Sequence, residues 1–107
     1  LKWLWIGENQ LTGTLPTELF KLSALEYLYV SKNSLTGTIP TEFGQLTALA
    51  SVGIDQNSFT GTLPTALGAI INLQRFNADH NRLTGTLPTQ LGSWSALTLF
   101  SMQSNGI

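Results

Sequence analysis

The sequence predicts an α/β solenoid in which one short unit is stacked several times. The segment Leu11–Pro16 (LTGTLP) returns as Leu35–Pro40, Phe59–Pro64 and Leu83–Pro88, each time 24 residues further along the chain. The same step separates five asparagines, which are Asn9, Asn33, Asn57, Asn81 and Asn105. No insertion or deletion interrupts the period, and a fixed period in this range is typical of stacked-repeat architectures.

The first element of each unit is predicted to be a short β-strand. In the first unit, Leu4 and Ile6 are apolar at alternate positions, which is the period of a strand with one buried face. The later units carry the same alternation at Leu28/Val30, Val52/Ile54, Phe76/Ala78 and Phe100/Met102. One such strand in every unit predicts a parallel sheet.

The LTGTLP segment is predicted to turn the chain toward a second element. Its glycine allows a turn that a side chain would hinder, and its proline fixes φ and ends any extended run. A threonine follows each proline, at Thr17, Thr41, Thr65 and Thr89, and we expect it to cap the N-terminus of a short helical turn. This turn carries apolar pairs that we expect to face the core: Leu19/Leu22, Phe43/Leu46, Leu67/Ile70 and Leu91/Trp94.

Together the units read L-x-x-L-x-L-x-x-N-x-L, followed by G-x-[LI]-P. This pattern resembles the plant-type leucine-rich repeat over essentially all 107 residues. The resemblance implies a right-handed horseshoe with a parallel β-sheet on the concave face, short 3-10 or α-helical turns on the convex side and a second, shorter strand near T-G-x-[LI]-P. Such repeats occur in ectodomains of receptor-like kinases and receptor-like proteins and in polygalacturonase-inhibiting proteins. The nearly uniform LTGTLPT sequence of the repeats also resembles algal and diatom repeat proteins.

We expect residues 1–107 to be a fragment of a single leucine-rich-repeat domain. They hold about four and a half units, and neither end has the polar cap that a terminal repeat needs. The resemblance implies an extracellular or cell-surface location, with neighbouring repeats or caps in the full-length protein. A kinase domain outside this segment is compatible with it. No apolar run approaches the ~18 residues needed to span a bilayer.

Composition excludes several functional classes. The formal net charge is −1, only 10% of residues are charged, and no run of Lys or Arg suggests nucleic-acid binding. There is no cysteine for a thiolate metal site or a nucleophile. The single histidine, His80, lies beside Asp79 and near Asp55 in the repeat pattern, which are too few ligands for a metal site. We therefore expect a protein that is not an enzyme and has no metal or cofactor.

The asparagine column is interpreted as structural. A buried Asn amide can form hydrogen bonds with backbone groups of its own turn and of the neighbouring turn. It thereby satisfies backbone groups that a bend would otherwise leave without a partner. We therefore predict an asparagine ladder in this column, in preference to a polar ligand site.

The strand positions that flank the buried ones point outward on the concave face and differ from unit to unit. The first column is Trp3, Tyr27, Ser51, Arg75 and Leu99. The second is Trp5, Tyr29, Gly53, Asn77 and Ser101, and the third is Gly7, Ser31, Asp55, Asp79 and Gln103. A framework that repeats while one face varies is typical of a recognition surface, so we expect this face to bind a protein, peptide or glycan.

Two groups of side chains on this face are the candidate partner-binding residues. The first is an aromatic block formed by Trp3, Trp5, Tyr27 and Tyr29, and aromatic residues are enriched at binding hot spots. The second is a mixed polar patch formed by Asp55, Arg75, Asn77, Asp79 and His80. The competing interpretations are that the aromatic rings pack on a preceding repeat or on one another, and that the polar patch is an ordinary solvated face.

The threonines of the LTGTLP segments suggest an alternative function. Thr12 and Thr14, with their counterparts in the next three units, would form a regular grid if T-G-T were extended and both threonines faced the same way. Such a grid resembles the faces of ice-binding solenoids, so the alternative is an ice-binding or adhesive surface protein. The competing interpretation is that threonine is a soluble, β-favouring residue at the edge of a second strand.

Overall fold

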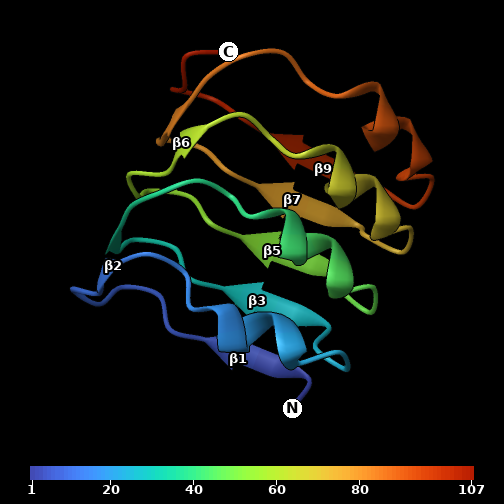
Figure 1. Cartoon of the computed structure of the whole chain (residues 1–107), viewed down its shortest axis with the longest axis horizontal. Coiled ribbons are helices and arrows are strands. Elements are labelled where there is room, and N and C mark those ends of the chain that lie inside the picture. Colours follow the sequence, from blue (N-terminus) through green and yellow to red (C-terminus); the bar gives the residue numbers. More distant parts are fainter.

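The computed structural model describes all 107 residues as a stack of similar turns around one core (Figure 1). One strand from each turn joins a five-stranded sheet, in the order β1-β3-β5-β7-β9. These strands are β1 (Trp3–Trp5), β3 (Tyr27–Tyr29), β5 (Ser51–Gly53), β7 (Arg75–Asn77) and β9 (Leu99–Ser101). All of their pairings are parallel, as the presence of one strand in every unit predicts.

The register of the sheet advances by one repeat per strand. Trp3 pairs with Tyr27, Tyr27 with Ser51, and Ser51 with Arg75. Because each partner lies 24 residues further along the chain, equivalent positions of neighbouring units lie side by side. The first two columns expected from the sequence therefore lie as straight rows across the sheet. The third lies just beyond the strand ends, where the carbonyls of Ser31 and Asp55 accept backbone hydrogen bonds from the preceding turn.

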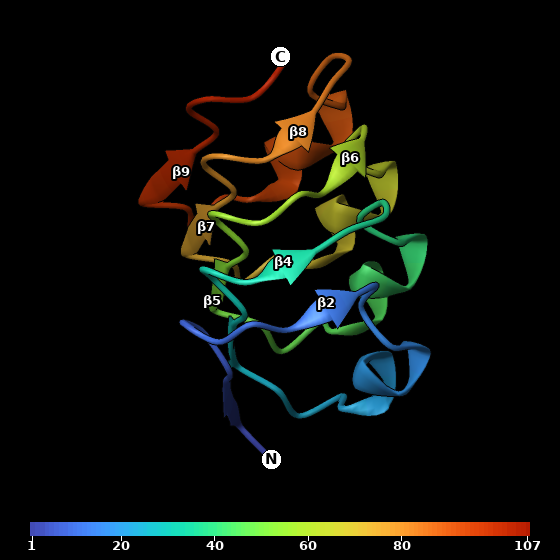
Figure 2. The ribbon, with the colours of Figure 1, turned by 90° about the vertical axis from the view of Figure 1, so that its left-hand side faces the viewer.

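A second set of short strands runs along one side of the stack, where the chain passes from the main sheet to the helices. These strands face the viewer in Figure 2. These are β2 (Thr12–Gly13), β4 (Ser34–Leu35), β6 (Thr60–Gly61) and β8 (Arg82–Leu83). They form two parallel pairs, β2-β4 and β6-β8, and a bridge from Thr38 to Thr60 links one pair to the next. The shorter second strand implied by the resemblance is therefore present.

Each of the first four turns also contains one five-residue 3-10 helix, on the side of the molecule opposite the main sheet (Figure 2). The helices are η1 (Thr17–Lys21), η2 (Thr41–Gln45), η3 (Thr65–Ala69) and η4 (Thr89–Ser93). The prediction of threonine caps is wrong, because the capping position is the preceding proline and no side chain bonds the helix start. Each threonine is already the first residue of its 3-10 helix, one position after the cap.

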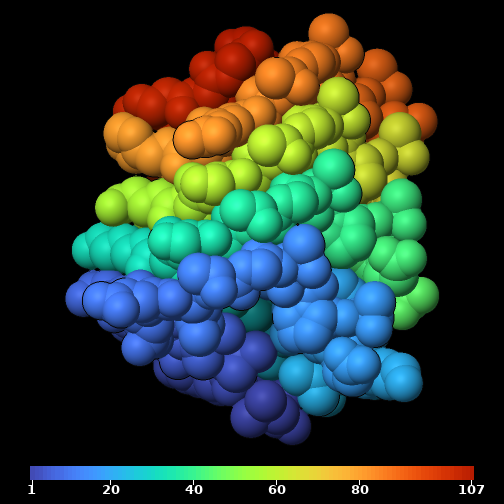
Figure 3. Space-filling view, turned by 60° about the vertical axis from the view of Figure 1, so that its left-hand side comes forward, coloured from blue at the N-terminus to red at the C-terminus, as the bar shows by residue number.

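The core lies between the main sheet and the helices and contains 22 buried apolar residues. The inward strand positions Leu28, Val30 and Ile54 are fully buried, and so are Phe43 and Leu67 from the helices. Burying each such side chain stabilises the fold by about 1.5–3 kcal/mol. Successive repeats cover one another without a break, as the stacked bands of colour in Figure 3 show.

The LTGTLP segments connect neighbouring turns through their glycines and threonines. Gly37 has φ +85°, and a Cβ built there would lie 2.9 Å from Cγ2 of Thr14 in the preceding turn. The Thr36 hydroxyl donates a hydrogen bond to the carbonyl of Gly13 at 3.3 Å. The same contacts recur one unit later, where Thr38 approaches Gly61 and Thr60 bonds Gly37.

This geometry does not provide the regular threonine grid that the alternative function requires. The glycine between the two threonines has a positive φ of 78–85° in all four units, so T-G-T is not a regular extended strand. The hydroxyls of Thr36 and Thr60 are also engaged by backbone carbonyls. The threonines of the T-G-T segments therefore connect neighbouring turns in this structure.

Gly68 and Gly92 provide a matched pair for testing how closely the helices pack. A Cβ at Gly68 would lie 2.5 Å from the carbonyl oxygen of Gln90, whereas a Cβ at the equivalent Gly92 meets nothing within 4 Å. We expect Gly68→Ala to lower the free energy of unfolding by about 2 kcal/mol, because a backbone group must move. Gly92→Ala should leave it unchanged or raise it slightly. Urea denaturation of both variants tests this, and equal losses would contradict it.

Candidate functional site

The side chains of the asparagine column are hydrogen-bonded to the backbone. The amide of Asn57 donates to the carbonyls of Val30 at 3.0 Å, Ile54 at 3.1 Å and Asp55 at 3.2 Å, and its Oδ1 accepts from the amide of Leu35 at 3.1 Å. Equivalent bonds are made by Asn33, Asn81 and Asn105. These amides tie each turn to its neighbours and have no free donor for a ligand.

The four aromatic residues meet as two cross-strand pairs on the outer side of the main sheet, which we call the concave face. The ring centroids of Trp3 and Tyr27 are 4.7 Å apart, and those of Trp5 and Tyr29 are 5.6 Å apart. Trp3 and Trp5 nevertheless remain 63% and 71% exposed, and both tyrosines are half-buried. The rings thus pack on one another, as one interpretation expected, and still offer a large apolar surface.

Two glycines allow these rings to lie close to the sheet. A Cβ at Gly53 would lie 2.6 Å from Cδ1 of Tyr29, and a Cβ at Gly7 would lie 3.3 Å from Nε1 of Trp5. The Tyr29 hydroxyl is also hydrogen-bonded to the hydroxyl of Ser51 on the next strand. The ring is therefore held in place before a ligand arrives, which reduces the entropy lost on binding.

Next to the aromatic block is a hollow of about 200 Å³. It is lined by Tyr27, Tyr29, Ala50, Ser51, Gln74 and Arg75. The concave face is recessed here because the outward residues of β5 are small. They are Ser51, which is 5% exposed, and Gly53. The sequence placed Ser51 and Gly53 in their columns, but the hollow was not predicted from it. The signal that could have predicted the hollow is the presence of two small residues at outward positions of one unit. Ala50 and Gln74, which precede the strands, were also not predicted.

The mixed polar patch is divided along the strands. Asp79 accepts hydrogen bonds from the Ser101 hydroxyl at 2.6 Å and the Gln103 amide at 2.7 Å. Asp55 accepts one from the Ser31 hydroxyl. These carboxylates lie at the strand ends, whereas Arg75 is at the start of β7, roughly 13 Å from Asp79 along an extended chain. The patch is therefore anionic at one edge and cationic at the other.

The remaining two residues of the patch are placed differently from each other. Asn77 lies on β7, where its Oδ1 accepts a hydrogen bond from the amide of Asp79 at 3.0 Å. His80 lies beyond the strand, in a left-handed backbone conformation with φ 55°, and is exposed. The histidine thus borders the concave face at the strand exit. No group of three or more His, Asp or Glu side chains converges anywhere in the chain.

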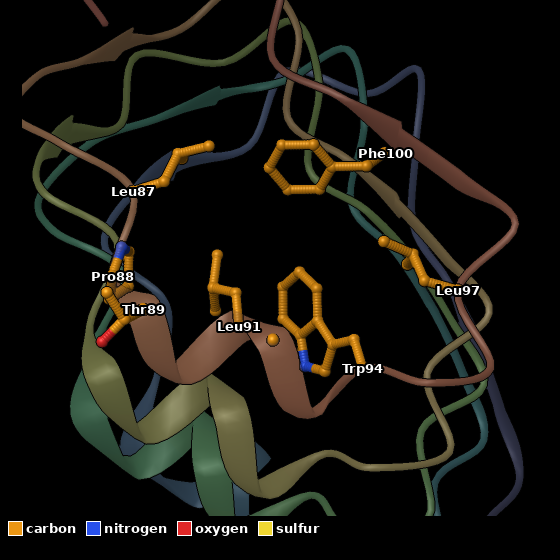
Figure 4. A pocket seen from close by; sticks show the side chains of 8 residues that line it. Leu87, Pro88, Thr89, Leu91, Trp94, Leu97 and Phe100 are labelled. Carbon is orange, nitrogen blue, oxygen red and sulfur yellow. The ribbon is translucent and has the colours of Figure 1, made fainter.

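A larger, apolar hollow of about 370 Å³ lies at the last turn, between η4 and β9 (Figure 4). Leu87, Leu91, Trp94, Leu97 and Phe100 point into it, and each occupies the same repeat position as a buried core residue of the preceding turn. This hollow is therefore the inner face of a repeat and lies away from the concave columns. None of the helices has the length and apolar character needed to cross a membrane.

Comparison with known proteins agrees with this architecture. Family models described as leucine rich repeat match residues 1–59 and 72–94. No curated protein matches the chain.

Solved structures of plant receptors are similar over 98% of the chain. The ectodomain of the Arabidopsis thaliana receptor kinase GASSHO1/SCHENGEN3, in complex with CASPARIAN STRIP INTEGRITY FACTOR 2, is 38% identical with a TM-score of 0.97. The plant peptide hormone receptor RGFR1, in complex with RGF2, is 35% identical with a TM-score of 0.96. The Arabidopsis receptor kinase HAESA, in complex with the peptide hormone IDA and the co-receptor SERK1, is 30% identical with a TM-score of 0.94.

The chain spans only 13%, 17% and 18% of the lengths of these three receptor chains. Within that span the predicted right-handed solenoid, with its parallel sheet and short 3-10 turns, is confirmed. The fold is that of a non-catalytic, ligand-binding module. The family-model match over more than half of the residues and the agreement of the repeats with these ectodomains lead to one conclusion: the chain belongs to the leucine-rich repeat family and is of the plant type.

Proposed function

We propose that this chain is part of an extracellular receptor ectodomain and that its concave face recognises a peptide. The observation that carries the proposal is the exposed aromatic block on a sheet whose framework is otherwise regular. The three similar ectodomains described above were solved with a peptide hormone or a named factor bound. This supports a peptide over a glycan as the ligand class.

The aromatic block supplies the apolar anchor for this peptide. Trp3 and Trp5 expose most of their surface, and Tyr27 and Tyr29 support them from the next strand. Large aromatic side chains dominate binding energy when a ligand excludes water from them. Because the sheet already fixes their positions, little conformational entropy is lost on association.

The polar patch supplies specificity and orientation. Arg75 lies at one edge of the face and Asp55 and Asp79 lie at the other, so a ligand with an asymmetric charge distribution has one favourable orientation. Asn77 offers its amide group between these edges, and His80 borders the face at the strand exit. Charges at the edges of a binding face contribute more to selectivity than to affinity.

Peptide selection followed by NMR tests the proposal. Random short peptides displayed on phage are selected against the immobilised chain, and the enriched peptides are then titrated into the isotope-labelled protein. The three tryptophans provide built-in reporters. Trp3 and Trp5 lie on the concave face, whereas the buried indole N–H of Trp94 donates to the carbonyl of Leu67 at 2.8 Å.

We expect the indole N–H signals of Trp3 and Trp5 to shift on peptide binding, while the signal of Trp94 stays in place. Failure to enrich any peptide would overturn the proposal. So would enriched peptides that shift the signals of the T-G-T segments or of η1–η4 and leave Trp3 and Trp5 unchanged. The buried indole also reports whether the fold survives the titration.

A further inference from the structure

We infer that the hollow beside the aromatic block binds an acidic side chain of the peptide, with Arg75 as its ion-pair partner; this inference rests on the proposed peptide-binding function. The hollow is open to the concave face and its volume of about 200 Å³ equals that of roughly seven water molecules. This is room for one side chain and not for a second segment of chain.

The charge in and around the hollow favours an anion. Arg75 is exposed and forms no ion pair, whereas Lys2 and Lys32 are paired with Glu26 at 3.6 Å and Glu8 at 3.5 Å. No carboxylate lines the hollow. Glu26 precedes Tyr27 and lies in the same row as Ala50, but its carboxylate is paired with Lys2. Asp55 and Asp79 lie at the opposite ends of their strands. The guanidinium of Arg75 is therefore free to bind a carboxylate with two parallel hydrogen bonds.

The other polar groups of the lining are mostly available as donors. The carbonyl of Ala50 already accepts the backbone amides of Gln74 at 2.8 Å and Arg75 at 3.2 Å, and the Ser51 hydroxyl is bonded to Tyr29. The side-chain amide of Gln74 and the hydroxyl of Tyr27 remain, and both can donate to a carboxylate. The tyrosine rings form one wall, which suits the aliphatic part of a glutamate side chain.

The spacing of the strands predicts where the acidic residue lies in the peptide. The outermost aromatic residues are on β1, and the hollow lies over β5, two strands away. Two strand spacings amount to roughly 10 Å, which an extended peptide covers in about three residues. A bound peptide that crosses the strands should therefore carry an acidic residue about three positions from its apolar anchor.

A double-mutant cycle on a peptide selected against the chain tests the inference. The peptide's acidic residue is changed to its amide, and the protein carries Arg75→Gln, which keeps hydrogen-bonding groups and removes the charge. On the wild-type chain the peptide change should weaken binding about tenfold, and on Arg75→Gln it should have almost no effect. Arg82→Gln is the control, because this second exposed arginine lies on β8 outside the hollow.

Each outcome of this cycle is decisive. Independent, additive effects of the two changes would overturn the inference, since interacting groups must couple. If amidating the peptide's C-terminus removes the coupling, the hollow binds a chain end and the inference is wrong. Selected peptides that shift Trp3 and Trp5 but show no preference for acidic residues would overturn this inference and leave the proposed function standing. Failure to select any peptide would overturn both.

Discussion

Replacing Asn57 by alanine is expected to lower the free energy of unfolding by about 4 kcal/mol. The lost amide makes three donated hydrogen bonds and one accepted bond, all to backbone groups. Two of these partners, the carbonyl of Val30 and the amide of Leu35, belong to the preceding turn. Asn57 is only 9% exposed, so water cannot easily replace the amide. Each buried group left without a partner costs about 1–3 kcal/mol.

Asn9 provides the control at the same repeat position. It is exposed, and its amide donates only to the carbonyls of Ile6 and Gly7 within its own turn. Asn9→Ala should therefore cost about 1 kcal/mol or less. Urea denaturation followed by circular dichroism measures both variants. If Asn9→Ala and Asn57→Ala were equally destabilising, the contacts between turns would not be the source of the ladder's stability.

The parts of the fold that depend on the repeat period could be predicted from the sequence. A strict step of 24 residues leaves one register for the parallel sheet, because a one-residue slip would turn Val52 and Ile54 to the solvent. The same step fixes which residues share a column. The buried asparagines could also be predicted, since an amide repeated at a bend has a clear partner in the backbone.

Details set by the backbone path within a turn could not be predicted in the same way. The residue before each asparagine adopts a left-handed conformation, with φ 55–57°. These residues are Glu8, Lys32, Gln56, His80 and Ser104. Five different residue types at one conformation give no propensity signal, because the neighbouring turns and the asparagine bonds impose it. The position of the helix cap, at the proline and not at the threonine that follows it, likewise depends on the closed path of the turn.

The sequence predicted which residues lie on the concave face, but it did not predict the shape of that surface. Column membership identified the aromatic block and the polar residues. The hollow depends on ring orientation, however, and this follows from contacts between units, such as that of Tyr29 with Ser51 and Gly53. The division of the patch into Arg75 at one edge and Asp79 at the other could be predicted, because these residues belong to the first and third columns.

Substituting alanine for Trp3, Trp5, Tyr27 and Tyr29 together is expected to weaken binding of a selected peptide about a thousandfold. Aromatic hot-spot residues each cost about 2 kcal/mol or more on truncation, and their effects are not additive, so a total of about 4 kcal/mol is a reasonable expectation. Titration calorimetry with the selected peptide measures the loss. The fold should persist, because both tryptophans are more than half exposed.

The matched control places four alanine substitutions on the opposite side of the molecule. Thr17, Glu18, Thr41 and Glu42 lie on η1 and η2 and are all exposed. This variant should bind the peptide with unchanged affinity. In both variants the indole N–H signal of Trp94, bonded to Leu67, reports an intact core. Retained affinity in the aromatic variant with this signal unchanged would show that the ligand binds elsewhere. Loss confined to the aromatic variant would leave the concave face as the binding surface, because each variant carries four alanine substitutions and the two sets lie on opposite sides of the molecule.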